Sequence, residues 1–425
     1  MTLALAVVPL LLLVLGFPIF LVLLTGSVLA LTGYMHMPMT AIQQNLFGSL
    51  NTPGLLAVPY FIFAGELMSR GSVSKRLVDM VGSVVGALPG AHGVTTVGTA
   101  TVFGAISGSS AASVVAVGKV MSPEMARDGY PPIFSAGMIT SVSAIGIIIP
   151  PSIPMIIYGA AAEASIPRLY AGGVVPGLIL AVALAIYIMA RARTGGFGTA
   201  QPLQFSRILR ASGRAVWALG APVIVLGGIY GGVFSPTEAA AIASAYALFV
   251  TMLVYRELTW REILDAATVS VVFTAQVLII IAAAGLFSWI LTVNQVPQTV
   301  VAWIAAQEVS PWQFLLIVNI LLLLVGCFMD PLSAILLLTP ILIPIVDLMG
   351  IDRVHFGIVM TLNLAIGLFT PPFGINIFVA QAVLGLKVAD IYRGVIPFFL
   401  VFLSVLMLIT FVPAITLWSV DLFLF

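Results

Sequence analysis

Long apolar stretches, separated by short polar or glycine-rich breaks, recur along the whole of this 425-residue chain. Clear examples are residues 315–325 and 398–411. A helix needs about 20 apolar residues to cross the hydrocarbon core of a bilayer. The chain therefore has room for about a dozen crossings or partial crossings, and we predict an all-α polytopic membrane protein.

Composition supports a membrane rather than a soluble protein. Hydrophobic residues make up 61% of the chain and charged residues only 7%, whereas ordinary soluble proteins carry about 25% charged residues. The net charge of +1 gives no indication of nucleic-acid binding. The single cysteine, Cys327, excludes an intramolecular disulfide, and we interpret it as a small apolar residue.

Basic residues predict the orientation of the chain. We predict helices over residues 3–33, 54–69, 131–163, 170–190, 215–233, 236–255, 264–291, 354–385 and 394–420. Residues 3–33 are read as a first transmembrane helix rather than a signal peptide, because no Lys or Arg precedes Arg70. In this trace 14 of the 16 basic residues lie on one side, and only Arg168 and Arg353 lie on the other. By the positive-inside rule the richer side is the cytoplasm.

Two apolar segments enter and leave on the same side in this trace, so we predict re-entrant hairpins over residues 93–118 and 312–345. Each has a helix-breaking centre, around Gly108 in the first and Asp330-Pro331 in the second. Irregular backbone at this depth is tolerated only where protein or a wet cavity surrounds it. Two short amphipathic segments, 74–88 and 298–308, are predicted to lie along the membrane interface.

The two halves of the chain repeat each other. Gly104 matches Gly326 at an offset of 222 residues, and "AIGIIIPP" from Ala144 matches "AIGLFTPP" from Ala365 at an offset of 221. An odd number of spans separates the copies, which predicts the inverted-topology repeat of many secondary transporters. We predict four parts: an N-terminal helix and connection (1–53), a first repeat (54–190), a cytoplasmic linker with two connecting helices (191–263), and a second repeat (264–425).

Paired prolines interrupt one long apolar segment in each half, at Pro150-Pro151 and at Pro371-Pro372. Because proline lacks an N–H and displaces the carbonyl four residues earlier, these pairs are expected to leave bare carbonyls at Gly146, Ile147, Gly367 and Leu368. Carbonyls with the nearby hydroxyls of Ser143, Ser152 and Thr370 suit Na+, and the N-terminus of the second half-helix suits an anionic substrate group. The alternative is a pair of packing kinks.

The hairpin centres carry polar groups of their own. The first offers the hydroxyls of Ser107, Ser109, Ser110 and Ser113, whose alternative role is close helix packing. The second carries Asp330, and an intramembrane acid is costly enough to suggest a function. Its alternative role is a helix N-cap ahead of Pro331, and both roles are compatible. Near the cytoplasmic end of the second predicted helix, Glu66 is expected to pair with Arg70 one turn later.

Five segments resemble the large membrane subunit of the tripartite ATP-independent periplasmic (TRAP) transporters: "VPYFIFAGELM" (58–68), "FGAISGSSAAS" (103–113), "GIIIPPSIPMIIYG" (146–159), "SPTEAAAIA" (235–243) and "GLFTPPFGINIFVA" (367–380). The resemblance implies an elevator-type, Na+-coupled importer of a small organic acid anion, such as a C4-dicarboxylate or a sialic acid, in a bacterial inner membrane. It also implies two partners, a small membrane subunit of about four helices and a periplasmic substrate-binding protein. No cofactor or metal beyond Na+ is expected.

The resemblance also implies where the ligands bind. Sodium would lie where each hairpin meets the proline pair of its own repeat, with the candidate residues Ser107, Gly108, Ser109, Ser143, Gly146, Ile147, Ile149, Gly326, Asp330, Gly367, Leu368 and Thr370. Substrate would lie between the two motifs, with the candidates Ser110, Pro150, Pro151, Ser152, Pro371, Pro372, Gly374 and Asn376. In this alignment Gly108 stands where the second hairpin has Asp330.

Two other functions remain as alternatives. An intramembrane hydrolase would need a base near the hairpin serines, and the nearest histidine in the sequence is His92. An ion antiporter or channel without an organic substrate usually needs a relay of intramembrane charges, and Asp330 is essentially the only deep candidate. No nucleotide-binding motif of the Gly-x-x-x-x-Gly-Lys type occurs, so the energy is expected to come from a gradient or from another chain.

Overall fold

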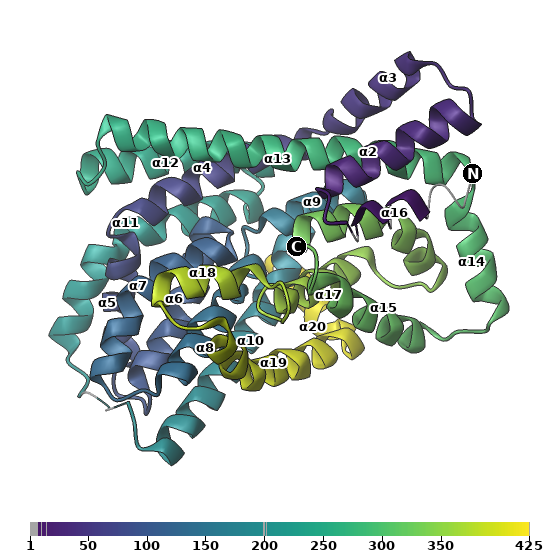
Figure 1. The fold of residues 1–425 in the computed structure, drawn as a ribbon. Helices are drawn as coiled ribbons and strands as arrows, with labels where there is room; N and C mark the ends of the chain where they lie inside the picture. The colour runs from purple at the N-terminus through teal and green to yellow at the C-terminus, as the bar shows by residue number, and fades with distance from the viewer. Residues whose placement is uncertain (1–6, 10, 14, 199, 201, 425) are drawn as a thin grey trace.

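Helices form the architecture in this computed structural model, which describes residues 7–9, 11–13, 15–198, 200 and 202–424 (Figure 1). Within those residues there is no strand, and six helices are long and apolar enough to cross a membrane. A seventh crossing is added if α3 and the segment from Pro53 to Arg70, which are bent by 63° to each other, count as one. Seven further apolar helices have only 10–17 residues, as expected for broken helices and hairpins.

The two repeats contain the same order of elements. In the first repeat these are α4 (Ala57–Arg70), α5 (Val73–Val85), α6 (Ala91–Ser107), α7 (Ser110–Arg127), α8 (Pro132–Val142), the 3-10 helix η3 (Ser143–Ile147), α9 (Ile153–Ala161) and α10 (Ile166–Gly195). In the second they are α13 (Trp260–Val293), α14 (Val296–Ala306), α15 (Pro311–Gly326), α16 (Pro331–Leu348), α17 (Arg353–Gly367), α18 (Ile375–Leu384) and α19 (Val388–Phe411). Each repeat therefore has two leading helices, a hairpin, a broken helix and a final long helix, and the first leading helix is long only in the second repeat.

The two hairpins approach each other from opposite ends of the molecule. In Figure 1, α6 and α7 lie toward the left and α15 toward the right. The turns that join α6 to α7 and α15 to α16 nevertheless line one common cavity. Hairpins that point at each other in this way form the inverted arrangement that the repeated sequence predicts.

The repeats interlock rather than lie side by side. Helix α8 packs against α19, and α7 packs against α18. The first contact is very close, because a Cβ added at Gly137 would overlap the backbone of Gly394. A second group of helices packs around α13, namely α2 (Ile19–Leu29), α3 (Met39–Leu50) and α4, and α12 (Pro236–Phe249) covers α4.

The connection between the predicted helices 170–190 and 215–233 is shorter than these bounds imply. Helix α10 continues to Gly195 and α11 (Phe205–Tyr230) begins well before Arg214, so the connection shortens to residues 196–204, of which 199 and 201 lie outside the described residues. Arginine is a good helix former, and its charge at a helix end is solvated without breaking the helix. The arginines in this region therefore lie within the two helices, and they do not mark where the helices end.

Both terminal helices differ from the prediction. Of the predicted helix 3–33, residues 3–6, 10 and 14 lie outside the described residues, and α2 begins only at Ile19, after Pro18, and continues as a π-helix (Ala30–Tyr34). At the other end, α19 stops at Phe411 and a separate α20 (Pro413–Phe423) follows, where one helix over 394–420 was predicted. In both places a proline interrupts the backbone hydrogen bonding.

The two basic residues assigned to the sparsely charged side lie together. Arg353 pairs with Asp347 at 2.7 Å and donates to the Ala162 carbonyl at 2.9 Å, while Arg168 lies 3.9 Å from Asp352. These contacts of Arg168 and Arg353 join the two repeats at the end where α9 and α17 meet.

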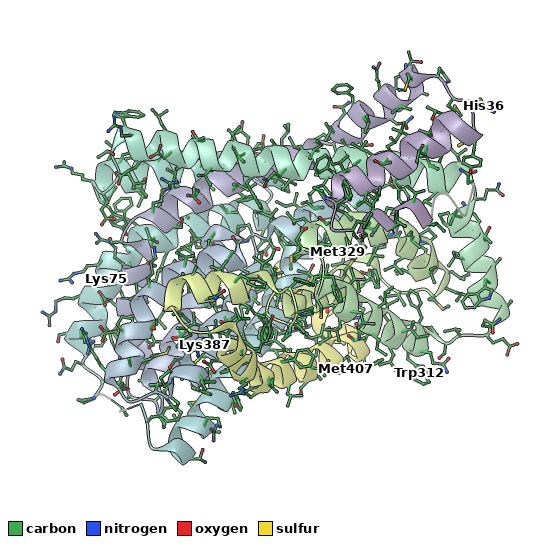
Figure 2. All side chains as sticks on the ribbon, viewed as in Figure 1. His36, Lys75, Trp312, Met329, Lys387 and Met407 are labelled. Atoms are coloured by element: carbon green, nitrogen blue, oxygen red, sulfur yellow. The ribbon has the colours of Figure 1, made fainter. Side chains whose placement is uncertain are left out.

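Figure 2 shows two residues from the opposite ends of the molecule in this view. Lys75 lies at the left edge, and Trp312 lies toward the right.

Candidate functional site

Each hairpin crosses the broken helix of its own repeat at a pair of glycines. A Cβ added at Gly104 would overlap the Gly146 Cα, and one added at Gly367 would lie 2.5 Å from the Gly326 carbonyl oxygen. Only glycine allows backbones to approach this closely. Gly146, a predicted sodium-site residue, therefore contacts the first hairpin. Gly326 and Gly367, two further predicted sodium-site residues, contact each other in the second repeat.

The first hairpin turns through Gly108, which has a left-handed φ of 58° and donates its N–H to the Gly104 carbonyl at 2.8 Å. Ser109 then caps α7, and its hydroxyl accepts from the Ala112 N–H at 3.4 Å. A Cβ added at Gly108 would lie 3.1 Å from the Pro151 carbonyl oxygen. The turn therefore rests directly on the first proline pair.

The second hairpin turns through Asp330, which caps α16. Its carboxylate accepts from the Ser333 N–H at 3.0 Å and from the Ser333 hydroxyl at 2.5 Å, so the predicted N-cap is confirmed. Because the capping residues of α7 and α16 are 221 residues apart, Asp330 corresponds to Ser109. The sequence alignment that paired Asp330 with Gly108 is wrong, since the second turn has one residue fewer ahead of its cap.

The proline pairs interrupt the helices, but most of the carbonyls they displace are not bare. The Ile147 carbonyl accepts from the Ser152 hydroxyl at 2.5 Å, the Leu368 carbonyl from the Asn376 N–H at 2.9 Å, and the Gly367 carbonyl from the Thr370 N–H at 3.2 Å. The prediction of bare carbonyls is therefore wrong at these three positions, because an unpaired buried carbonyl is costly. Each carbonyl oxygen keeps a second lone pair that suits a cation.

Hydroxyl groups near the breaks are also engaged. Ser143 donates to the Ile139 carbonyl at 2.8 Å and Thr370 to the Ile366 carbonyl at 2.6 Å, each one turn back in its own helix. The Ser107 hydroxyl lies 3.4 Å from both the N–H and the carbonyl of Ser109. Because the protons are committed to carbonyls, the hydroxyl oxygens present lone pairs rather than protons to a ligand. Ile149 contributes only backbone here, and its N–H donates to the Ile145 carbonyl at 3.1 Å.

One side chain joins the two repeats at the centre of the molecule. The buried Asn376 donates through Nδ2 to the Ser110 hydroxyl at 2.7 Å and to the Thr140 carbonyl at 3.0 Å. Its amide oxygen, also buried, has no hydrogen-bond partner within the described part of the chain. An unsatisfied buried amide oxygen costs about 1–3 kcal/mol, so this atom is a natural ligand for a cation or for a donor group on a substrate.

A cavity of about 370 Å³ lies where both hairpin turns meet α13. Its lining includes the predicted residues Gly108, Ser109, Ser110, Ile147, Asp330 and Leu368, and four residues of α13 that sequence reasoning missed: Phe273, Gln276, Val277 and Ile280. The signal that could have identified this wall was Gln276, an amide in the middle of an apolar span. The other predicted substrate residues do not line this cavity, namely Pro150, Pro151, Ser152, Pro371, Pro372, Gly374 and Asn376.

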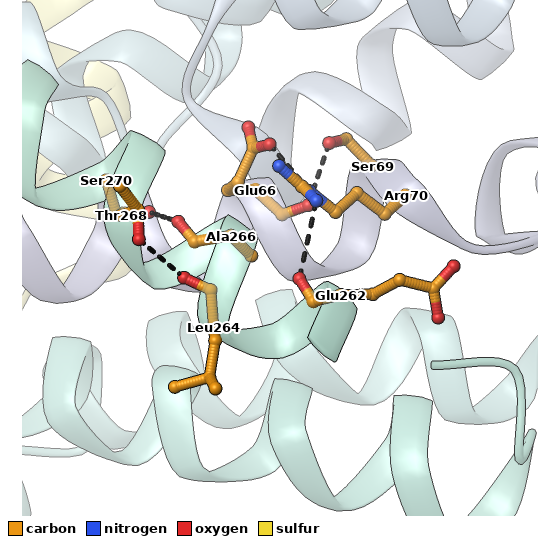
Figure 3. A network of polar contacts seen from close by, with 8 residues as sticks. All are labelled: Glu66, Ser69, Arg70, Glu262, Leu264, Ala266, Thr268 and Ser270. Atoms are coloured by element: carbon orange, nitrogen blue, oxygen red, sulfur yellow. Dashed lines mark hydrogen bonds and ion pairs between the residues drawn. The ribbon is translucent and has the colours of Figure 1, made fainter. Parts of the chain in front are cut away.

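A second cavity, of about 290 Å³, shares Ser109 and Phe273 with the first and extends to Glu66. The predicted Glu66–Arg70 pair is confirmed, with 2.8 Å between Oε1 and Nε, and Arg70 also donates to the Glu262 carbonyl at 3.3 Å (Figure 3). A Cβ added at Gly65 would lie 2.8 Å from the Ser107 carbonyl oxygen. Helix α4 therefore touches the first hairpin turn beside this cavity.

The histidine considered as the base of a hydrolase lies far from the hairpin serines. His92 lies at the start of α6 and pairs with Asp128 at 2.9 Å. Ser107 lies at the opposite end of the same helix, about 22 Å away at the rise of an α-helix. Proton transfer needs hydrogen-bond distance, so His92 does not activate the hairpin serines.

Comparison with known proteins gives a consistent result. The family model described as "Tripartite ATP-independent periplasmic transporter, DctM component" matches residues 6–415. The chain is 42% identical over 363 residues to the C4-dicarboxylate TRAP transporter large permease protein DctM of Pseudomonas aeruginosa, covering 85% of each chain. It is 40% identical over 407 residues to the isethionate TRAP transporter permease protein DctMQ of Oleidesulfovibrio alaskensis, covering 96% of this chain and 64% of that longer relative.

Among solved structures, the fold is similar to that of the Alcanivorax borkumensis YdaH transporter. The TM-score is 0.63 at 16% sequence identity, and the match covers 90% of this chain and 89% of the other. At this level of identity the likeness concerns the fold alone. It places the two repeats of this chain in an architecture already known from a membrane transporter.

Proposed function

The chain belongs to the DctM-component family of the tripartite ATP-independent periplasmic transporters, and we propose that it moves a small organic acid anion across the membrane together with Na+. It is a multi-span protein of the bacterial inner membrane and a transporter subunit rather than an enzyme. The observation that carries the proposal is the cavity in which both hairpin turns, one from each repeat, meet a single helix, α13.

Sodium is proposed to bind beside each glycine crossing. In the first repeat the ligands are drawn from Ser107, Gly108, Ser109, Ser143, Gly146, Ile147 and Ile149, and in the second from Gly326, Asp330, Gly367, Leu368 and Thr370. Their carbonyl, hydroxyl and carboxylate oxygens are hard ligands suited to a small hard cation. The second lone pairs of the Ile147 and Leu368 carbonyls support this assignment.

The substrate is proposed to occupy the shared cavity, with its carboxylate near Ser110 and the N-terminus of α7. The further substrate candidates are Ser152, Asn376, the two proline pairs and Gly374. Of these, Asn376 is linked to the cavity through its bond to Ser110. The relatives named above are C4-dicarboxylate and isethionate permeases. The first of these relatives supports a C4-dicarboxylate as substrate, and the proposed range also includes a sialic acid or a similar carboxylate.

Two partners complete the proposed system, a small membrane subunit of about four helices and a periplasmic protein that delivers the substrate. The hairpins and broken helices of both repeats are proposed to slide as one unit against the group of helices around α13. The interlocked packing of α7 with α18 and the bond from Asn376 to Ser110 support a single moving unit. Such a unit keeps the contacts between its ligands and the hairpins and broken helices, and only the contacts with α13 change during the step.

Replacement of Na+ by K+ tests the coupling. The three-part system is reconstituted in proteoliposomes, and uptake of labelled substrate is measured at equal membrane potential in either salt. Uptake is expected to vanish in K+, because the gradient supplies the energy. Full uptake in K+ would contradict the sodium assignment and favour protons.

A further inference from the structure

One face of α13 forms the wall of the shared cavity opposite the hairpins. Its lining residues are Phe273, Gln276, Val277 and Ile280, which follow the i, i+3, i+4, i+7 spacing of a single helix stripe. Three of the four are apolar. Gln276 is the only polar side chain that α13 presents to the cavity.

Gln276 lies at the centre of the membrane span. Helix α13 runs from Trp260 to Val293, so either end is about 25 Å from Gln276 at the rise of an α-helix. The side chain is exposed and has no hydrogen-bond partner within the described part of the chain. By contrast, Thr268 and Ser270 of the same helix donate to carbonyls one turn back, at 2.8 Å and 2.7 Å. An unpaired amide at this depth is costly unless it meets water or a ligand.

The other cavity residues define what a ligand finds there. Asp330 is the only charged side chain of the described lining, and no Lys, Arg or His belongs to it. A carboxylate of the substrate therefore depends on the first hairpin, where α7 begins at Ser110, and on bound cation. A second carboxylate on the α13 side would meet apolar walls and one neutral amide, with no compensating positive charge.

We propose that Gln276 is a specificity-determining residue whose amide hydrogen-bonds an uncharged hydroxyl or oxo group of the substrate. The cavity then narrows the substrate range proposed above, from carboxylates in general including C4-dicarboxylates, to small monocarboxylates that carry a hydroxyl or oxo group. This inference rests on the proposed function and adds a substrate class to it. An amide both donates and accepts, so it serves a hydroxyl and an oxo group equally, while Phe273, Val277 and Ile280 contact the carbon skeleton.

A matched series of four-carbon acids tests the proposal. Binding of 2-hydroxybutyrate, 2-oxobutyrate, butyrate and succinate to the purified complex of large and small subunits is measured by calorimetry in Na+. Gln276→Leu is expected to weaken binding of the hydroxy and oxo acids about tenfold, equivalent to about 1.4 kcal/mol. Butyrate binding is expected to stay unchanged. Thr268→Val, on the same helix but outside the cavity, is the control and is expected to alter none of the four.

Three outcomes would overturn the inference. Gln276→Leu could weaken butyrate as much as 2-hydroxybutyrate, which would mean a general packing role. Succinate could bind the unaltered complex more tightly than the substituted monocarboxylates. Gln276→Asn could leave binding of the hydroxy acid fully lost while Gln276→Leu retains it. Failure of the proposed function itself is distinguishable, because the unaltered complex would then bind none of the acids in a Na+-dependent manner.

Discussion

The two proline-broken helices have nearly the same sequence pattern but opposite surroundings. Pro150, Pro151 and Ser152 are buried, whereas Pro371, Pro372 and Phe373 are exposed, Phe373 to 58%. Each break contains one cis peptide between its two prolines, and each meets a hairpin turn of its own repeat. The local sequence therefore determines the break, but not its environment.

The difference follows from the helix that passes behind each break. In the first repeat α10 carries Gly173 and Gly177, and a Cβ added at Gly173 would lie 2.8 Å from the Ile148 carbonyl oxygen. At the offset of 221 residues that relates the two proline pairs, the equivalent of Gly173 on α19 is Gly394, which packs against Gly137 of α8 rather than against the second break. At the second break α19 contributes instead the Tyr392 hydroxyl, which donates to the Pro372 carbonyl at 2.7 Å. The close helix approach that covers the first break is therefore made elsewhere in the second repeat.

The supports of the two broken helices differ as well. In the second repeat the buried His355 lies 3.3 Å from the Thr416 hydroxyl and from the Thr410 carbonyl, and Asn319 donates to the Thr410 hydroxyl at 3.0 Å. The residue 221 positions before His355 is Phe134, which packs among aromatic rings, with Phe398 at 5.4 Å and Phe197 at 5.5 Å. One repeat is held by apolar contacts and the other by a polar network.

The largest expected effect comes from the glycine crossings. The Cβ added by Gly104→Ala would overlap the Gly146 Cα, while the Cβ added by Gly326→Ala would lie 3.2 Å from the Gly367 Cα. Overpacking costs about 1–3 kcal/mol or more, so Gly104→Ala is expected to lose about 3 kcal/mol and transport with it, and Gly326→Ala about 1 kcal/mol. Thermal unfolding and Na+-dependent uptake measure both. Gly227→Ala, which meets no atom within 4 Å, is the control. Equal losses at the two crossings would show that the repeats are packed alike.

Cysteine labelling sharpens the contrast in exposure. In a Cys327→Ala background, Phe373→Cys is expected to react with a water-soluble maleimide about tenfold faster than Ser152→Cys, because opening of a buried site costs about 1.4 kcal/mol or more. Na+ and substrate are expected to change the ratio if both breaks belong to the sliding unit proposed above. Equal rates under every condition would contradict the difference between the two breaks.

The two hairpin caps provide a smaller and more specific test. Asp330→Asn keeps the capping geometry, since Asn caps as well as Asp, but removes the charge. If the carboxylate helps to hold a cation, the Na+ concentration for half-maximal uptake is expected to rise about fivefold, equivalent to about 1 kcal/mol. Ser109→Asp makes the first cap resemble the second and is expected to lower that concentration. An unchanged sodium response in both variants would leave Asp330 with a structural role alone.

The smallest expected effect concerns the polar support of the second repeat. Thr410→Val removes the hydroxyl that accepts from Asn319, and is expected to destabilise the protein by about 1 kcal/mol. Thr410→Ser keeps the hydroxyl and serves as the control. Thermal unfolding of the purified complex measures the difference. A stability equal to that of Thr410→Ser would mean that the network contributes nothing that apolar packing does not.

Much of the fold follows from local chemistry that the sequence displays. Proline pairs break the helices because the ring removes a hydrogen bond wherever it stands. Asp330 ahead of Pro331 begins α16 because the cap and the proline at the first helical position need no distant partner. The hairpins and the inverted repeat were predictable for the same reason, together with the constant offset between the halves. The helix ends near Gly195 and Phe411 were not, because charge and hydropathy report the bilayer rather than the backbone.

Only the tertiary structure decided which polar atoms are paired and which face a ligand. The Asn376 amide donates to the hydroxyl of Ser110, which is 266 residues away in the sequence, and no local sequence pattern predicts that bond. The carbonyls displaced by the prolines regain partners from Ser152 and from the Asn376 N–H once the chain turns back on itself. Gln276 reads in the sequence as one amide in an apolar helix, and becomes a cavity residue because both hairpin turns pack opposite it. Propensities act between neighbours in the chain, whereas burial and hydrogen bonding depend on which distant segments the whole fold brings together.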